Sequence, residues 1–420
     1  MGARDGCVRF FRHRRLQIGA RGLQTGPRPT EAGYSLVELL VAMAIALSIM
    51  GSVFTLVNGW QLGFGAENER ADEQQRLRVA VDALTRALAL AGGGAHRGNR
   101  SSPLGFSVAS VFPFRQGAEA PDAPGTVRSD TLTVVYVLPQ TVAETTIQQP
   151  LAAQSGTAFI NLDGGCPAGD PACGFAAGMD VMVYDDTGSY DTFRITAVRP
   201  GMLVLQHTMP DTPQSYRAGA RIVEAASETY ALKTDPAADT FQLIHYNGVT
   251  STAAVVEHVI GLTFEYFADP SPPILIRAVS EPIGPWTTYG PKPPPLDVRS
   301  TAYGAGENCA FQVDATTGRQ TPRLPLLGDG SSTLVKLSEA ELKDGPWCPD
   351  AANPHRYDAD LLRIRRVSAT LRVEASLPAL RGPAGLLFAR GGTARSANRW
   401  VADQEVRFDM SPKNLNVGRE

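Results

Sequence analysis

The stretch GYSLVELLVAMAIALSIMGSVFTLV, residues Gly33 to Val57, decides how this 420-residue chain is organised. Its part from Leu39 to Val57 is 19 residues long and holds no charged side chain. At about 1.5 Å of rise per residue, a helix of that length spans roughly 29 Å, close to the thickness of the hydrocarbon core of a bilayer. The stretch therefore predicts a membrane-spanning helix near the N-terminus. Its one carboxylate, Glu38, lies at the start of the run and costs free energy there unless another group compensates the charge.

The flanking charges predict the orientation of this helix. Seven arginines precede Tyr34, whereas the segment after the run is mainly acidic, with Glu67, Glu69, Asp72 and Glu73 against Arg70. The positive-inside rule therefore places the leader in the cytoplasm and the rest of the chain in the periplasm. Without the leader, 32 of the 39 basic and 40 of the 42 acidic residues remain, a net charge of −8. A net-acidic body argues against nucleic-acid binding as the main function.

Two simpler interpretations compete with a specialised helix. A cleaved secretory signal has an apolar region of about 7–15 residues followed by a small-x-small cleavage site. This run is longer, and the sequence NGWQLGFGAENE after it offers no such site. A plain uncleaved signal anchor fits the length, but it leaves Glu38 unexplained.

Gly33 followed by YSLVELLVAMAIALS resembles the class III signal of type IV pilins and pseudopilins. The resemblance implies that a prepilin peptidase cleaves between Gly33 and Tyr34 and that the new amine of Tyr34 is methylated. Glu38 would then be the fifth residue of the mature chain. The sequence departs from the family pattern in three ways: Tyr34 replaces the usual phenylalanine, the leader of 33 residues is long, and the acidic Glu31 precedes the cleavage point.

The same resemblance implies a role for Glu38. Cleavage creates a positive amine on Tyr34, and in the family the glutamate pairs with the amine of a neighbouring subunit as it enters the filament. The pair neutralises two charges that would otherwise be exposed to an apolar surrounding.

The segment after the membrane run predicts a second helical stretch. Gly59, Gly63 and Gly65 each cost roughly 1 kcal/mol in a helix, so a weak or locally extended patch is expected there. From about Glu67 the helical pattern returns, and three glycines at residues 92–94 end it. One apolar stripe recurs at i, i+4, i+7 and i+11, opposite the charged residues Arg78, Asp82 and Arg86, and consists of Leu77, Val81, Leu84 and Leu88.

The remainder, residues 95–420, predicts a β-rich head in which strand-length apolar runs alternate with turns. Residues 157–233 contain closely spaced strands and are expected to form an inserted β module, a small barrel or sandwich. Nine prolines at residues 270–295 oppose regular structure, so residues 269–357 are expected to be an irregular insertion. The segments VVEHVIGLTFEYF and RRVSATLRV resemble the closing strands of PilW-like minor pilins.

Four cysteines beyond the apolar run predict disulfides, which persist in oxidising compartments such as the periplasm. Sequence neighbours pair most simply as Cys166–Cys173 and Cys309–Cys348, although four cysteines allow three connectivities. A zinc site fits poorly, because CPAGDPAC is not a C-x-x-C knuckle and has no nearby histidine.

Catalytic and metal-binding motifs are absent from the sequence, so no catalytic residue, cofactor or metal is predicted. Asp185, Asp186 and Asp191 in DDTGSYD have oxygen ligands that suit calcium, but a hairpin turn is the better interpretation because the calcium-loop register is missing. A basic C-terminal region is interpreted as a solvated or subunit-contacting strand face rather than a DNA site, and comprises Arg363, Arg365, Arg366, Arg372, Arg390, Arg395 and Arg399.

These features together predict an α+β protein of the type IV pilin kind. Its expected parts are a leader (1–33), the membrane half of the helix (34–58), its amphipathic half (59–94) packed on an antiparallel sheet, and the head. The predicted function is that of a minor pilin that helps to initiate or cap a type IV pilus. Expected partners are prepilin peptidase, other major and minor pilins, the inner-membrane assembly platform and the membrane itself, without specific nucleic acid. The alternatives are a J-type minor pseudopilin of type II secretion and a signal-anchored periplasmic enzyme or ligand-binding protein.

Overall fold

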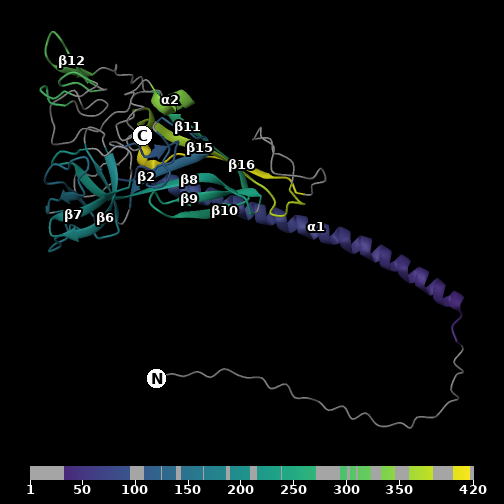
Figure 1. The fold of residues 1–420 in the computed structure, drawn as a ribbon. Coiled ribbons are helices and arrows are strands. Elements are labelled where there is room, and N and C mark those ends of the chain that lie inside the picture. Colours follow the sequence, from purple (N-terminus) through teal and green to yellow (C-terminus); the bar gives the residue numbers. More distant parts are fainter. Residues whose placement is uncertain are drawn as a thin grey trace, which may run out of the picture. The chain divides into compact units, whose positions relative to one another are not determined.

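The computed structural model describes residues 33–94, 108–123, 125–138, 143–163, 165–185, 190–208, 215–237, 239–270, 294–299, 303–308, 311–322, 333–345, 359–381 and 401–416 (Figure 1). The chain divides into two compact units, Met1–Gly63 and Phe64–Glu420. The predicted leader, apart from Gly33, lies outside the described residues.

One long helix, α1 (Leu36–Leu90), runs through 55 residues. The prediction of a locally extended patch is wrong, because the backbone is helical throughout the stretch that holds Gly59, Gly63 and Gly65. A glycine costs about 1 kcal/mol, whereas interrupting the helix sacrifices hydrogen bonds and requires a second, costly nucleation. Gly65 also faces Leu380, since a β-carbon added to it would lie 3.9 Å from Leu380 Cδ1. The helix ends before Gly92, whose φ of +70° favours glycine.

The second half of α1 packs on the head along the predicted stripe. Leu84 and Leu88 are fully buried, and Leu77 and Val81 are partly buried against the same core. The charged residues opposite them, including Asp82, are exposed, as a solvated face requires. This half of the helix therefore supplies one wall of the main core.

Among the described residues, ten strands join in one antiparallel sheet. Its central path runs β1-β2-β8-β5-β6-β7-β4, while β3 and β9 also pair with β8, and β10 pairs with β9. The strands are β1 (Val111–Phe112), β2 (Thr131–Val137), β3 (Glu144–Thr146), β4 (Thr157–Phe159), β5 (Asp180–Tyr184), β6 (Tyr190–Arg199), β7 (Met202–His207), β8 (Arg221–Asp235), β9 (Thr240–Tyr246) and β10 (Thr252–Glu257).

Strand β8 connects two parts of this sheet. Its later residues pair with β2 and β9 beside the main core, whereas residues 221–224 pair with β3 and β5. The strands around that earlier end enclose a second core, which includes Ile147, Phe193 and Ile222. This β module begins at β3, earlier than the predicted residue 157, and it shares β8 with the rest of the sheet.

A second sheet has the order β14-β11-β15-β16, all antiparallel. Its strands are β11 (Val259–Ala268), β14 (Val335–Lys336), β15 (Ile364–Val373) and β16 (Gln404–Met410). The inward residues Leu262, Phe264 and Tyr266 of β11 are buried, as their alternation predicts. The alternating residues of β15, from Val367 to Val373, are buried in the same core as α1.

The prediction that residues 269–357 are wholly irregular is wrong. The described parts hold a hairpin of β12 (Phe311–Val313) and β13 (Gln320–Pro322), the strand β14 and the helix α2 (Glu339–Asp344). Ser338 and Glu341 form a capping box at the start of α2, a local signal that the proline-rich surroundings obscure. Two further short helices are α3 (Ala359–Leu362) and the 3-10 helix Lys413–Leu415.

Candidate functional site

The predicted cleavage point lies immediately before the first turn of α1. Gly33, Tyr34 and Ser35 are not helical, and α1 begins at Leu36. Tyr34 is 90% exposed. A β-carbon added to Gly33 would meet no atom of the described residues within 4 Å, so no steric contact among them requires glycine at that position. The peptide bond between Gly33 and Tyr34 therefore lies outside regular secondary structure.

Glu38 has a local role in addition to the predicted pairing: its carboxylate caps the start of α1. Its Oε2 accepts a hydrogen bond from the backbone N–H of Ser35 at 3.0 Å, while the Oγ of Ser35 accepts one from the N–H of Val37 at 3.3 Å. Both bonds satisfy backbone donors that the helix itself leaves unpaired at its N-terminus. A carboxylate here also interacts favourably with the helix dipole. The signal was available, because Ser35-x-x-Glu38 is the spacing of a capping box.

The helix that follows Glu38 presents an apolar surface. Residues Leu36–Val57 form the one helix, among the described residues, that is long and apolar enough to cross a membrane, and none of it is buried within the structure. Leu40, Ile49 and Phe54 illustrate this, since each is more than half exposed. An unburied apolar helix of this length requires lipid or other helices around it.

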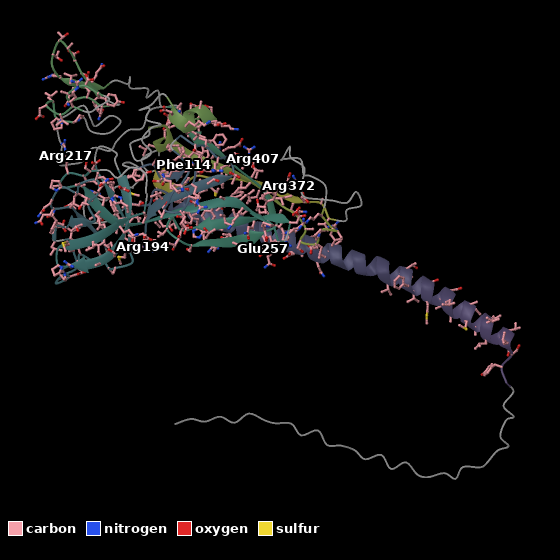
Figure 2. The ribbon with its side chains drawn as sticks, viewed as in Figure 1. Phe114, Arg194, Arg217, Glu257, Arg372 and Arg407 are labelled. Atoms are coloured by element: carbon pink, nitrogen blue, oxygen red, sulfur yellow. A yellow bond between two sulfur atoms is a disulfide. The ribbon has the colours of Figure 1, made fainter. Side chains whose placement is uncertain are left out.

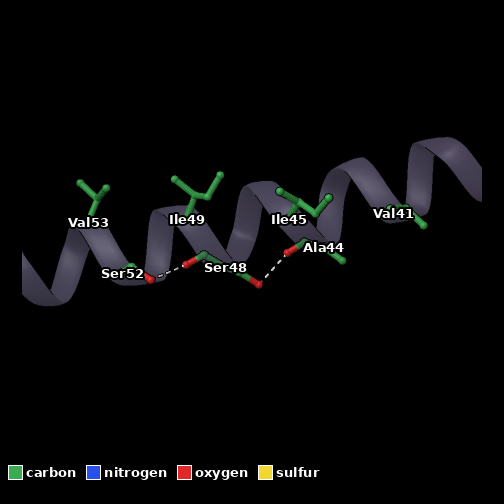
Figure 3. Close-up of a pocket in the computed structure, with 7 residues that line it drawn as sticks. All are labelled: Val41, Ala44, Ile45, Ser48, Ile49, Ser52 and Val53. Atoms are coloured by element: carbon green, nitrogen blue, oxygen red, sulfur yellow. Dashed lines mark hydrogen bonds between the residues drawn. The ribbon is translucent and has the colours of Figure 1, made fainter.

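One face of this helix carries a row of small residues, Ala44, Ser48 and Ser52, beside a row of β-branched residues. A shallow groove runs along it, lined by Val41, Ala44, Ile45, Ser48, Ile49, Ser52 and Val53 (Figure 3). The hydroxyl of Ser48 donates to the carbonyl of Ala44 at 2.8 Å, and that of Ser52 donates to the carbonyl of Ser48 at 2.9 Å. The serines thus satisfy their own hydrogen-bonding groups within the helix, which lowers the cost of placing them in lipid. Small residues spaced four apart allow another helix to approach closely.

The cysteines of the β module form a disulfide, Cys166–Cys173, which closes the loop CPAGDPAC. The loop is further fixed by Asp170, whose carboxylate accepts the backbone N–H groups of Ala172 and Gly174 at 2.8 and 2.7 Å. Cys309 and Cys348 lie outside the described residues.

The acidic loop between β5 and β6 connects two paired strands. Its flanking residues Asp185 and Asp191 are described, whereas Asp186 lies outside the described residues. The carboxylate of Asp191 is 1% exposed and its Oδ2 lies 3.2 Å from Nδ1 of His207. Burial lowers the pKa of His207. Within the described residues no group of three or more His, Cys, Asp or Glu side chains is arranged to hold a metal ion.

The prediction of a solvated or subunit-contacting arginine face at the C-terminus is wrong for two of its members, which are buried within the chain. The side chain of Arg363 is 3% exposed and pairs with Asp360 at 2.9 Å, and that of Arg372 is 2% exposed and pairs with Asp403 at 2.6 Å. Figure 2 shows Arg372 together with Arg407, on the neighbouring strand β16. Alternation alone placed Arg372 on the outer face of β15, but the segment that carries Asp403 covers that face. Arg390, Arg395 and Arg399 lie outside the described residues.

Comparison with known families adds one finding. A family model described as the prokaryotic N-terminal methylation motif matches residues 28–54. The match contains Gly33, Tyr34 and Glu38 and most of the apolar run. A comparison with curated proteins gave no significant match.

The matched motif is that of a type IV pilin-like prepilin, and the apolar helix followed by an antiparallel head is consistent with a pilin-like fold. The motif implies processing by prepilin peptidase in a membrane and pilus-type context. The motif and the apolar helix together indicate a pilin-like N-terminus of the membrane-anchored type.

Proposed function

We propose that this chain is a minor pilin of a type IV pilus, cleaved between Gly33 and Tyr34 and methylated on the Tyr34 amine. Its head faces the periplasm before assembly and the cell surface afterwards. The observation that carries the proposal is the arrangement at the start of α1. A non-helical Gly33–Tyr34 bond, a carboxylate one helical turn further on and an unburied apolar helix follow one another within the matched motif.

The geometry of Glu38 supports two simultaneous roles for its carboxylate, capping of the helix by one oxygen and pairing with an amine by the other. Oε2 is engaged by the N–H of Ser35, while the described residues give Oε1 no partner. We propose that Oε1 receives the methylated amine of a neighbouring subunit. Capping would hold the carboxylate in place, so that less side-chain entropy is lost when the two subunits pair. In lipid, this pair would neutralise two charges that are costly to leave separate.

The small-residue face supports helix-to-helix packing during assembly. Lipid tails are as apolar as the helix, so packing in a membrane depends on close approach rather than on hydrophobic burial. The groove along Ala44, Ser48 and Ser52 allows such an approach. We propose that another pilin subunit packs its own helix there.

The proposed place in the pilus is at its initiation or its tip. The head carries a β module with its own core and an additional hairpin, β12–β13, beyond the sheet that α1 covers. Such elaboration suits a subunit present in few copies, because every repeat along a filament shaft would otherwise have to accommodate it.

The experiment is deletion and complementation in the native host, with two readouts. Loss of surface pili without loss of protein secretion, restored by the full chain, is the expected result. Loss of secretion with normal pili would assign the chain to type II secretion instead, as a pseudopilin. Normal pili and normal secretion, with a chain that retains its leader, would identify a signal-anchored protein of another kind.

A further inference from the structure

A glutamate lies on the buried face of α1, where the helix begins to contact the head. Glu73 is 0% exposed, and neither of its carboxylate oxygens has a hydrogen-bond partner among the described residues. It belongs to the stripe of Leu77 and Leu84, which continues towards the N-terminus through Glu73 and Glu69 to Ala66. A buried ionised carboxylate without a partner is expensive, so its position requires an explanation.

The part of the head around Glu73 consists of two segments, residues 374–381 and 401–405, which we call the collar. Ser376 donates to Glu69 through its N–H at 2.8 Å and through its hydroxyl at 2.5 Å. Arg76 donates to the carbonyl of Glu374 at 2.9 Å. A small apolar cluster completes the contact and consists of Ala66, Ala375, Leu380 and Val401. The collar thus holds the helix on both sides of Glu73.

The charges that face Glu73 come from several elements. Those on α1 are Glu69, Arg70 and Arg76. The collar contributes Asp403, whose negative charge repels an ionised Glu73. The remaining charged groups of this region are already engaged: Arg372 with Asp403 at 2.6 Å, Arg381 with Glu374 at 3.3 Å, and Glu405 at 3.8 Å from Arg372. His258, at the junction of β10 and β11, lies near Arg76 and Arg381.

Burial and the neighbouring acids favour the neutral form of Glu73. Burial raises the pKa of Glu73 to about 8, with a further contribution from the negative charge of Asp403, and the arginines Arg76 and Arg70 only partly oppose this. Burial, together with Arg76 and Arg381, lowers the pKa of His258. At neutral pH, Glu73 therefore retains its proton in the docked helix and His258 is uncharged.

We propose that Glu73 is a proton-dependent latch between α1 and the collar: the protonated side chain stays buried with the helix docked, and loss of the proton loosens this stretch of helix from the head. The latch is independent of the pilus assignment, because it rests only on the contacts of residues 64–420. As a consequence, the stretch of α1 around Glu73 detaches from the collar more often at alkaline pH and less often at acidic pH.

The pH dependence of the docked state follows from the difference between the pKa of Glu73 in the docked helix and its pKa in the released helix. The docked carboxyl titrates at about 8 and a released one near 4.5, so the stabilisation is complete below 4.5 and declines as pH rises towards 8. Above that value it declines no further, since both states are then ionised. His258 changes charge below its usual value of 6.5, so its effect is largely confined to more acidic conditions.

Hydrogen exchange of the full chain in detergent micelles tests the latch. Peptides covering residues 64–80 are followed between pH 6.5 and 9.0, with each rate divided by the intrinsic exchange rate at that pH. For the wild type we expect local opening to increase by roughly tenfold or more up to about pH 8.5 and then to level off. Glu73→Gln cannot ionise and should show no such increase.

The matched control is Glu67→Gln, which removes a glutamate from the same helix whose side chain is 71% exposed. It should follow the wild type at every pH. The proposal is overturned if local opening of residues 64–80 in the wild type is independent of pH. This outcome can be read from the wild type alone, without any variant. The proposal is also overturned if Glu73→Gln keeps the pH dependence of the wild type.

Discussion

The backbone N–H of Ser35 and the Oε2 of Glu38 are joined by a hydrogen bond of 3.0 Å across the first turn of α1. The acidic residue of the apolar run therefore stabilises the start of its own helix before any second subunit arrives. Its proposed pairing with a neighbouring amine must be compatible with this bond. The two contributions of the carboxylate, a hydrogen-bond acceptor and a charge, can be separated by substitution.

Glu38→Ala removes both contributions, whereas Glu38→Gln removes the charge and keeps an oxygen that can accept the N–H of Ser35. Loss of a helix cap costs about 0.5–2 kcal/mol, so fraying of the first turn is expected for the alanine variant alone. Incorporation into filaments depends on the charge, and both variants should therefore be depleted at least tenfold from sheared filaments. Immunoblots of filament and membrane fractions measure this, and peptidase cleavage should be normal in both. Normal incorporation of Glu38→Gln would show that capping, and not charge pairing, is what the filament needs.

Leu84→Ala removes a fully buried side chain from the main core where α1 meets the head. The lost burial and the cavity that remains should lower the free energy of unfolding by about 2–5 kcal/mol. Urea unfolding in detergent, followed by circular dichroism of the sheet, measures the change. Val79→Ala is the control on the same helix, because Val79 is 45% exposed, and it should change the value by less than about 0.5 kcal/mol.

The pair of Arg372 and Asp403 is almost entirely buried. Arg372→Met leaves the Asp403 carboxylate without its main partner and should destabilise the head by about 3–5 kcal/mol in the same unfolding measurement. The double variant Arg372→Met with Asp403→Leu should recover part of that loss, because the unpaired Asp403 carboxylate is gone and only Glu405, 3.8 Å from Arg372, loses its neighbour. Arg86→Met, at a side chain that is 74% exposed, should be nearly neutral. A double variant as unstable as the single one would show that the pair is needed for more than neutralising charge.

The disulfide Cys166–Cys173 closes a short loop, with a sequence separation of 7. In the chain-entropy account, such a cross-link stabilises by roughly 2–3 kcal/mol. Replacing both cysteines by serine should lower the melting temperature of the β module, and a reducing agent should do the same to the wild type. In the double serine variant, the reducing agent should not lower the melting temperature of the β module any further. Equal melting of wild type and variant would indicate that Asp170 and the surrounding loop hold the structure without the cross-link.

Periodicity in the sequence was sufficient to predict the membrane run, the stripe from Leu77 to Leu88 and the buried face of β11. Each of these depends on local spacing that a single element displays along its own length. The stripe could have been extended backwards to Glu73 by the same spacing, but hydropathy excluded a glutamate from a buried position. Its burial depends on the collar, which is more than 300 residues away in sequence, as the contact between Glu69 and Ser376 illustrates.

Other features could not be predicted from local patterns. The way β8 connects two parts of one sheet depends on which strands pair across long separations, and no alternation of side chains specifies that. Arg372 looks like an outward residue of β15 until the segment carrying Asp403 covers it. The capping role of Glu38, by contrast, follows from the local spacing Ser35-x-x-Glu38 and is predictable from the sequence.

Mass spectrometry of the N-terminus of the protein, purified from its native membrane, tests the central claim most directly. The account predicts a chain that begins at Tyr34 with a methylated amine, and a Gly33→Val variant that keeps its leader although the structure accommodates the added side chain at that position. A native chain that still carries residues 1–33, or one that begins elsewhere, would contradict it.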